Sequence, residues 1–419
     1  MMNNGCVVVG GGPAGMVLGL LLARCGVRVT VLEKHSDFLR DFRGDTVHAS
    51  TLTLLDELGL GERFAAMPHR DVEQMTVRLD AGEAAVADFR RLPGAHRHIA
   101  FAPQWDLLDL LAAAAEEEPT FTLVRDAEVI DVLRDGGTVV GVRYRDRATG
   151  GEHDLRAALT VACDGRSSAV RAAAGLAPRR FGVPMDVLWF RLPRERTDPD
   201  GVFGRLSAGR LAITIDRGDY WQCAYVIPKG ADAALRAAGG IDGFRQEVAA
   251  LLPWTADRLD PIRSWDDVKL LDVELNRLRR WYTDGLLLIG DAAHAMSPVG
   301  GVGINLAVAD AVAAARIVGP ALQSNGAVPL RLLRGVQRRR WLPTALIQGV
   351  QRGIHRAILA PALVAAPASG AGRLPVPLRL LRRFPALQGL TARMVAIGPL
   401  PEHAPDWARR PAARSGTGR

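Results

Sequence analysis

The sequence predicts an α/β protein with α+β parts: a Rossmann-like dinucleotide-binding domain, an inserted and mainly antiparallel β domain, and a helical C-terminal region. Three observations predict this fold class. The chain opens with an apolar strand, a glycine-rich turn and an apolar helix, whereas strand-like runs rich in tryptophan, isoleucine and valine fill about 180–275. Leucine- and arginine-rich helical patterns follow residue 330. A length of 419 residues allows two or three such units.

The glycine-rich turn has the pattern Gly-x-Gly-x-x-Gly at Gly10, Gly12 and Gly15, between a strand from about Cys6 and a helix predicted over 13–24. Gly10 allows the tight turn, Gly12 lets the backbone approach a pyrophosphate, and Gly15 lets the helix pack on the sheet. Unpaired amides at the start of the helix then face the phosphates. The motif predicts a dinucleotide site.

A second apolar strand, 27–32, ends at Glu33. The carboxylate of Glu33 lies where the 2′-hydroxyl of a ribose would be bound, which favours an unphosphorylated ribose, as in NAD or FAD. The alternative is a glycine-rich turn in some other α/β protein, and the strand, helix and acidic residue together make it the weaker interpretation. Which dinucleotide binds stays open at this point.

The stretch up to residue 163 alternates helical and strand-like runs. A helix begins near Ala49, where leucines recur every three residues, and 99–104 leads into a helix over 105–115. Strands are predicted at 72–79, 84–92, 121–133, 138–146 and 154–163. The antiparallel domain that follows is predicted to contain strands at 186–192, 211–216 and 219–227.

A buried strand over 284–289 and an alanine-rich helix over 303–318 indicate that the chain returns to the first domain. Gly290 and Asp291 follow that strand. Asp291 either caps the turn or accepts hydrogen bonds from the hydroxyls of a ribityl chain. A second glycine-rich stretch, 298–305, opens the helix, and its amides suit the negative edge of a reduced flavin.

A third motif, Asp164-Gly165, also joins a strand to a turn and helix. Alone it is weak, because Asp-Gly is a common turn and Ser167 a common N-cap.

In order and spacing the three motifs resemble those of the class A flavoprotein monooxygenases, which share the para-hydroxybenzoate hydroxylase fold. The resemblance covers roughly the first 320 residues. It implies non-covalent FAD, NADH or NADPH as co-substrate, and O2. It further implies a monooxygenase that hydroxylates a small to medium aromatic or polyketide-like substrate through a flavin C4a-hydroperoxide.

The resemblance also assigns site residues. Glu33 is expected to hold the adenosine ribose, Asp291 the ribityl chain, and 301–305 the isoalloxazine edge. Arg43 and Gln104 match positions near the pyrophosphate or ribityl chain. The expected cofactor-binding residues are Gly10, Gly12, Pro13, Ala14, Gly15, Glu33, Lys34, Arg43, Gln104, Val129, Asp164, Gly290, Asp291, Gly301, Gly303, Ile304 and Asn305.

Two residues are candidates for catalysis. His48, at a predicted helix start, is either a proton relay or an ordinary polar residue at a helix N-terminus. Pro298 matches the family segment that flanks the flavin. Trp189, Trp221 and Tyr225 are candidates for the substrate cavity, because strand period two puts them on faces that either wall a cavity or form the core of the sheet.

Other functions of the same fold remain open. The chain is alternatively another FAD-dependent oxidoreductase, namely an oxidase, a reductase or a halogenase, or a flavin-containing small-molecule binding protein. The stretch 223–228 is similar to the halogenase Trp-x-Trp-x-Ile-Pro element, but Cys223 and Tyr225 stand where the tryptophans should be, which counts against halogenation.

Composition narrows the remaining classes. The formal charge of +8 comes from arginines spread along the chain, without a module that reads nucleic acid. The four cysteines lack metal-type spacing, so we expect no metal. Apolar content of 48% and charged content of 23% suit a folded cytoplasmic protein. We expect no apolar stretch to reach the length of a membrane span, and therefore no stable membrane insertion. The oligomeric state is left open.

Domain limits follow from these patterns. The FAD-binding domain is expected to be discontinuous, the substrate domain to be inserted in two pieces, and the end of the chain to be helical and then disordered. The limits are 1–72, 94–179 and 276–329 for the FAD-binding domain, 73–93 and 180–275 for the substrate domain, 330–405 for the C-terminal helical region, and 406–419 for the tail.

Overall fold

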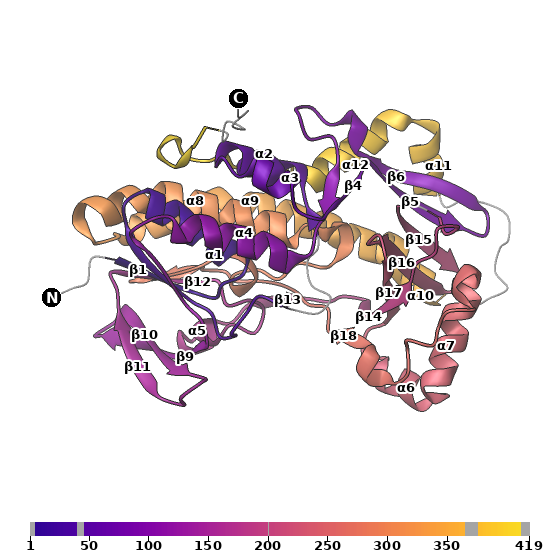
Figure 1. Ribbon diagram of the computed structural model, residues 1–419, viewed down its shortest axis with the longest axis horizontal. Coiled ribbons are helices and arrows are strands. Elements are labelled where there is room, and N and C mark those ends of the chain that lie inside the picture. The colour runs from indigo at the N-terminus through magenta and orange to yellow at the C-terminus, as the bar shows by residue number, and fades with distance from the viewer. Residues whose placement is uncertain (1–4, 40–45, 200, 365–375, 412–419) are drawn as a thin grey trace, which may run out of the picture.

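A six-stranded sheet forms the centre of one half of the molecule in the computed structural model, which describes residues 5–39, 46–199, 201–364 and 376–411 (Figure 1). The strand order is β20-β21-β12-β1-β2-β8, and every neighbouring pair is parallel except β20 with β21. The strands are β1 (Gly5–Val9), β2 (Arg28–Leu32), β8 (Phe121–Val124), β12 (Leu159–Ala162), β20 (Tyr282–Thr283) and β21 (Leu286–Leu288).

Helices cover one face of this sheet, and a small sheet with a short helix covers the other (Figure 1). β1 is buried on both faces, which explains its unbroken apolar run. On the helical face lie α1 (Pro13–Arg24), α4 (Gln104–Glu116), α8 (Gly303–Asn325) and α9 (Leu330–Ile354). On the other face lie β9 (Ala127–Asp135), β10 (Thr138–Asp146), β11 (Glu152–Arg156) and α5 (Ala169–Ala173).

Two predicted strands, 121–133 and 154–163, are each divided between two sheets. The first divides at Asp126, whose φ of 56° breaks the extended chain between β8 and β9. The second divides where Ala157 N–H donates to Val140 of β10 and Ala158 N–H donates to Gly5 of β1. Side-chain alternation is the same in both halves of each run, so it could not reveal the exchange of partner.

A seven-stranded sheet of order β18-β14-β17-β16-β15-β5-β6 forms the second half of the fold. The early hairpin β5–β6 joins it through the parallel pair of β5 with β15. The strands are β5 (Gln74–Leu79), β6 (Gly82–Asp88), β14 (Met185–Pro193), β15 (Val202–Ser207), β16 (Arg210–Asp216), β17 (Tyr220–Pro228) and β18 (Lys269–Leu271). The helices α6 (Asp232–Ala237) and α7 (Gly240–Leu251) follow β17 along the chain.

Short elements connect the two large sheets. One small sheet has the order β3-β7-β4, and another pairs β13 with β19. Their bounds are β3 (Thr46–Val47), β4 (Arg70–Val72), β7 (Ile99–Phe101), β13 (Arg179–Phe181) and β19 (Leu275–Arg277), with helices α2 (Ala49–Glu57) and α3 (Gly61–Ala65) beside β3 and β4 in sequence.

Beyond α9 the chain continues as a π-helical turn (His355–Leu359), α10 (Ala360–Val364), α11 (Val376–Arg383) and α12 (Pro385–Ala396). Composition predicts disorder from residue 406, but the structure corrects this: Asp406–Ala408 forms a 3₁₀ turn and Ala408 is buried. Arg24 Nη1 donates to the Ala408 carbonyl at 3.0 Å, a tertiary contact that composition does not encode. Residues 412–419 lie outside the described residues.

One helical stretch, Val299–Ser324, is long and apolar enough to cross a membrane by length and composition. This corrects the expectation that no apolar stretch of the chain reaches that length. Its most apolar window is 67% buried within the protein, between α1 and α9, as expected of a core helix.

Candidate active site

The three sequence motifs meet at one end of the six-stranded sheet. Gly10 lies so close to the Asp-Gly motif that an added Cβ would be 2.6 Å from the Cys163 carbonyl oxygen. Gly290 lies between α1 and α8, where its own added Cβ would be 3.6 Å from Ala14 Cβ and 3.2 Å from Ala307 Cβ. Segments separated by more than a hundred residues therefore form one site.

Two of the three glycines in the glycine-rich loop are closely packed, and the third is open. Gly10 has φ of 100°, and an added Cβ at Gly15 would be 1.9 Å from the Gly10 oxygen, so neither position accepts a side chain. At Gly12 an added Cβ would meet no atom of the described residues within 4 Å. The loop is closed where it packs on the protein and open where Gly12 faces outward, beside the unpaired amides of α1.

Glu33 is fixed at the end of β2. Its carboxylate accepts hydrogen bonds from Gly11 N–H at 2.9 Å and His35 N–H at 3.1 Å, and the residue is 8% exposed. Lys34, the next residue, is exposed. Gln104 is the first residue of α4, whereas Val129 is buried in the core between the two sheets. Arg43 lies outside the described residues.

Asp164 is a buried carboxyl with one oxygen unsatisfied. Its Oδ2 accepts a hydrogen bond from Val170 N–H at 3.1 Å, while Oδ1 has no partner among the described residues. Burial raises the pKa of Asp164, only partly opposed by its hydrogen bonds. Arg171 links this motif to the Gly-Asp turn, because its Nη1 donates to the Ala292 carbonyl at 3.0 Å.

A buried charge network supports the Gly-Asp turn from behind. Asp310 of α8 accepts hydrogen bonds from Gly290 N–H at 3.1 Å and Arg340 Nε at 2.9 Å, and its Oδ2 lies 2.6 Å from His294 Nε2. Burial alone would raise the pKa of Asp310, but His294 and Arg340 outweigh it and hold the pKa below its usual value. The turn that presents Asp291 is thus held by an ionised carboxylate.

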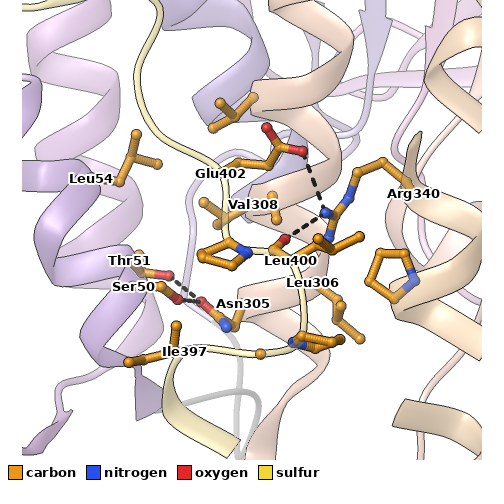
Figure 2. A pocket seen from close by; sticks show the side chains of 16 residues that line it. Ser50, Thr51, Leu54, Asn305, Leu306, Val308, Arg340, Ile397, Leu400 and Glu402 are labelled. Carbon is orange, nitrogen blue, oxygen red and sulfur yellow. Dashed lines mark hydrogen bonds and ion pairs between the residues drawn. The ribbon is translucent and has the colours of Figure 1, made fainter. Parts of the chain in front are cut away.

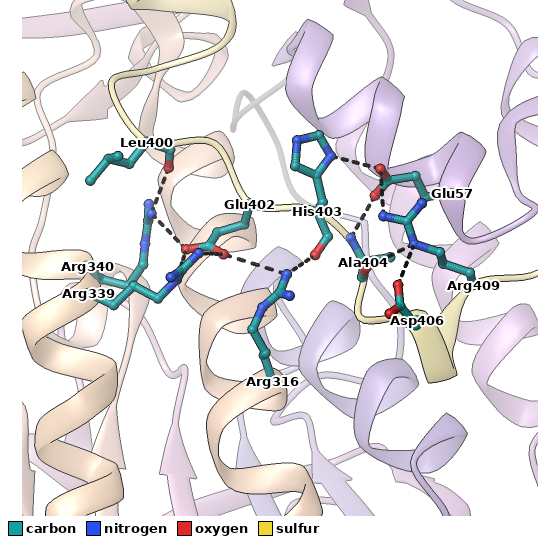
Figure 3. Close-up of polar contacts among 10 residues, drawn as sticks. All are labelled: Glu57, Arg316, Arg339, Arg340, Leu400, Glu402, His403, Ala404, Asp406 and Arg409. Atoms are coloured by element: carbon teal, nitrogen blue, oxygen red, sulfur yellow. Dashed lines mark hydrogen bonds and ion pairs between the residues drawn. The ribbon is translucent and has the colours of Figure 1, made fainter.

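The C-terminal segment completes this network. Glu402 accepts hydrogen bonds from Arg339 Nε at 2.6 Å and lies 3.4 Å from Arg340 Nη1 (Figure 3). The Leu400 carbonyl accepts another from Arg340 Nη1 at 3.0 Å (Figure 2). Arg340 is 1% exposed, and these partners offset the cost of burying its positive charge.

The second glycine-rich stretch is held against β3 and α2. Gly301 has φ of 64°, and Thr46 Oγ1 donates to its carbonyl at 3.1 Å. Asn305 Oδ1 accepts hydrogen bonds from Ser50 Oγ at 2.7 Å and Thr51 Oγ1 at 2.8 Å (Figure 2). These contacts fix the start of α8, where the amides of Gly303, Ile304 and Asn305 lack partners within the helix.

Sequence reasoning missed the side chains of α9 that hold the segment around Pro298. Gln351 Nε2 donates to the carbonyls of Ser297 and Val299, both at 2.9 Å, and Ser297 Oγ lies 2.9 Å from His355 Nε2. Gln351 and His355 are both buried. The sequence signal that could have found them is the spacing of Gln351 and His355, two polar residues four apart on the apolar side of an otherwise amphipathic helix.

His48 is fully buried at the N-terminus of α2. Its Nδ1 lies 2.8 Å from the Val395 carbonyl, so Nδ1 carries the proton and Nε2 is a bare acceptor. Nε2 has no partner among the described residues. Burial lowers the pKa of His48 to about 4, which keeps the ring neutral near pH 7 and makes it a poor proton carrier.

The three aromatic candidates lie on opposite faces of the seven-stranded sheet. Trp221 and Tyr225 pack in the cluster with α7, and their polar atoms are paired: Trp221 Nε1 donates to Asp198 at 2.9 Å and Tyr225 OH to Glu247 at 3.4 Å. This corrects the assignment of both residues to a substrate cavity. Their face of the sheet is covered by α7, and strand alternation cannot show which face of a sheet a helix covers.

Trp189 lies on the other face. It packs against apolar clusters that include Val299, next to Pro298, and Val395, whose carbonyl holds His48. An added Cβ at Gly300 would also lie 3.6 Å from Val395. Trp189 Nε1 is buried without a partner among the described residues. The orphaned donor of Trp189 thus belongs to a residue that packs against the same apolar cluster as Val299, and the orphaned acceptor of His48 belongs to a residue held by Val395, which lies beside Gly300.

A glycine-rich loop after β1, an acidic residue at the end of β2 and a Gly-Asp turn after β21 are typical of dinucleotide-binding oxidoreductases. The chain matches the family described as FAD binding domain over residues 5–349. It is 35% identical to a 6-methylpretetramide 4-monooxygenase from Streptomyces rimosus, over 92% of this chain and 91% of the relative. It is 30% identical to a rifampicin monooxygenase from Streptomyces venezuelae, over 73% of this chain and 62% of that protein.

The solved structure of the anhydrotetracycline hydroxylase OxyS from Streptomyces rimosus has the same fold, with a TM-score of 0.72 at 22% identity, over 94% of this chain and 75% of that one. The chain belongs to the class A flavoprotein monooxygenases and is an FAD-dependent monooxygenase. Within the described residues, no group of three or more His, Cys, Asp or Glu side chains is placed to hold a metal ion.

Proposed function

We propose that this enzyme consumes NADH or NADPH and hydroxylates a small to medium aromatic or polyketide-like molecule. The observation that carries the proposal is the pair of orphaned buried atoms, His48 Nε2 and Trp189 Nε1, beside the glycine-rich segment of an FAD-binding fold. The relative that matches over nearly its whole length is named for oxidation of a polyketide, 6-methylpretetramide, which supports the same substrate class.

The residues of the converged motifs fit FAD. Gly12 and the first amides of α1 would hold the pyrophosphate, Glu33 the adenosine ribose, and Asp291 the ribityl hydroxyls. The first turn of α8, from Gly303, would stabilise the flavin edge that becomes negative on reduction. When bound, FAD supplies acceptance of a hydride from NAD(P)H and, once reduced, reaction with O2. The protein supplies position and charge.

Two polar contacts orient the substrate. A phenolic hydroxyl donates to His48 Nε2, and a carbonyl accepts from Trp189 Nε1–H. Aromatic polyketides carry both groups on one planar frame. With a pKa of about 4, His48 holds the hydroxyl in place without removing its proton. The apolar side chains around Trp189, such as Val299 and Ile213, exclude water from the ring that is oxidised.

Gln351 positions the wall of this site. By holding the carbonyls of Ser297 and Val299, it fixes the Pro298 segment relative to the first turn of α8. The segment therefore presents backbone and small side chains to the cofactor, a role that fits Pro298 as a positioning residue without acid–base chemistry.

The test is a reconstitution. The protein is purified, saturated with FAD, and mixed with NADH or NADPH and a panel of phenols, anthraquinones and tetracyclic polyketides. We expect a yellow protein whose NAD(P)H oxidation is stimulated by planar hydroxy-carbonyl compounds and yields a product with one added oxygen. A protein that takes up no FAD, or one that only forms peroxide with every compound, would overturn the proposal.

A further inference from the structure

A basic groove lies where the edge strand β20 meets α9, outside the site described above. It is bounded by Arg279, Arg280, Arg334, Arg338, Tyr282 and Trp341 and encloses a volume of about 400 Å³. We call this feature the arginine groove. Its size falls within the range of ligand sites, which runs from about 300 to 1,000 Å³. None of its residues takes part in the contacts proposed above for FAD or for the substrate.

All four arginines of the groove are positively charged, and among the described residues they have no acidic partner. None of them forms an ion pair with any residue in the described ranges. Two contacts shape the groove: Arg334 Nε donates to Tyr282 OH at 3.1 Å, and Gln337 Nε2 donates to the Arg279 carbonyl at 2.8 Å. Like charges held around one hollow repel each other, and a bound anion would relieve that repulsion.

A second, independent observation also points to an anion. Arg277 lies 4.7 Å over the ring of Trp341, and its Nη1 is buried without a partner among the described residues. Arg277, Arg179 and Arg352 surround the ring of Phe181 at 5.7, 5.3 and 5.0 Å. Burial first, and then the charges of Arg179 and Arg352, lower the pKa of Arg277. The unbalanced positive charge thus continues from the groove past Trp341.

We propose that the arginine groove binds a small phosphorylated ligand with a flat ring, in its simplest form a nucleoside diphosphate. A guanidinium group can bind two phosphate oxygens at once. Arg279 and Arg280 precede β20, and Arg334 and Arg338 lie on α9, so the two pairs can hold two phosphates. Trp341 is 40% exposed, which leaves ring surface for a base to stack on. ADP binding is measured without turnover, so this proposal can fail or hold separately from the proposed hydroxylation.

The shape of the site favours a small ligand over a macromolecule. A nucleic acid or an acidic protein needs a broad basic surface, whereas these arginines converge on one hollow. Two phosphorylated ligands share this chemistry: a free nucleotide, and the adenosine phosphate half of NADPH. The experiment distinguishes them.

The experiment titrates ADP into the FAD-saturated holoenzyme by calorimetry, so that ADP cannot enter the FAD site. The variant is Arg279→Glu/Arg338→Glu. The matched control is Arg331→Glu/Arg356→Glu, which changes the same charge at two exposed arginines outside the groove. We expect ADP affinity to fall at least about tenfold in the groove variant and less than about twofold in the control, since only the former loses charge-assisted contacts. Flavin absorbance and melting temperature verify that both variants are folded.

Two further arms identify the source of the ligand. If the groove variant raises the KM for NADPH and leaves kcat unchanged, the ligand is the co-substrate; if ADP binding is lost while that KM stays constant, it is a separate nucleotide. Trp341→Ala should weaken ADP more than inorganic phosphate, because only ADP carries a ring. A holoenzyme that gives no heat with ADP, or equal losses in groove variant and control, would overturn the proposal. So would binding of anionic vesicles or oligonucleotides in place of ADP.

Discussion

The two faces of the seven-stranded sheet carry similar aromatic side chains in opposite states. On the α7 face, Trp221 is fully buried, packs against Trp254 at 5.1 Å, and donates its Nε1–H to Asp198. On the face toward the cofactor domain, Trp189 is only half-buried, yet its Nε1 is buried and the Nε1–H has no partner in the described part of the chain. The indole N–H on the α7 face therefore has a hydrogen-bond acceptor, whereas the indole N–H on the other face has none among the described residues.

This difference separates structural residues from binding residues. A buried donor left unpaired costs about 1–3 kcal/mol, so a fold keeps one only where something else satisfies it. His48 presents the complementary case, a buried acceptor without a donor, beside the same glycine-rich segment. We call the Trp189 side of the sheet the open face and the α7 side, with Trp221, the closed face. We infer that substrate supplies the missing hydrogen-bond partners on the open face, whereas the protein supplies them on the closed face.

The largest expected effect is on the closed face. Trp221→Ala should destabilise the protein by about 3–5 kcal/mol, because it empties a fully buried site and removes the donor to Asp198. Urea unfolding followed by tryptophan fluorescence measures this loss. Trp221→Phe, which keeps most of the volume, serves as the control and should lose less. If Trp221→Ala were stable but failed to bind substrate, the assignment of the two faces would be reversed.

The pH dependence of stability tests the burial of His48. Its pKa is about 4 in the folded protein and about 6.5 when unfolded, so below pH 6.5 the unfolded chain binds the proton first. Stability from this group is therefore complete above pH 6.5 and is lost as pH falls toward 4, by at most about 3 kcal/mol. Unfolding free energies of wild type and His48→Asn over pH 4–8 give the difference. Parallel curves would contradict the burial of a neutral imidazole.

On the open face, His48→Asn should affect catalysis more than folding near pH 7. The amide still donates to the Val395 carbonyl, but the acceptor at Nε2 is lost. We expect kcat/KM for a phenolic substrate to fall about tenfold, the value of one hydrogen bond, with FAD affinity unchanged. A methyl ether of the same substrate should lose nothing further in the variant. Equal losses for the phenol and its ether would show that Nε2 does not contact the hydroxyl.

The smallest expected effect comes from Trp189→Phe. Removal of an unpaired buried donor should leave stability within about 1 kcal/mol of wild type, while KM for a carbonyl-bearing substrate rises about three- to tenfold. Steady-state kinetics and thermal unfolding give the two numbers. A marked loss of stability with unchanged KM would place Trp189 with Trp221 as a structural residue.

Local sequence patterns predicted the elements whose formation depends only on residues close together in the sequence. The helix predicted over 13–24 is α1, Pro13–Arg24, and the helix predicted from near Ala49 is α2. In each case, turn chemistry and apolar spacing act within a few residues. The site residues that were missed, such as Asp310 and Gln351, act on segments far away in sequence. The sequence likewise could not predict which face of β14 and β17 is open, because side-chain alternation distinguishes two faces of a strand but does not show what packs on each.

The most direct test of the account is the origin of the oxygen in the product. FAD-loaded enzyme is supplied with NAD(P)H and a phenolic polyketide under ¹⁸O₂, and the product mass is measured for wild type, Trp221→Phe and His48→Asn. We predict one ¹⁸O atom per product molecule for wild type and Trp221→Phe, and a lower yield with more peroxide for His48→Asn. An unlabelled product, or NAD(P)H consumption that ends only in peroxide, would contradict the assignment of a monooxygenase site on the open face.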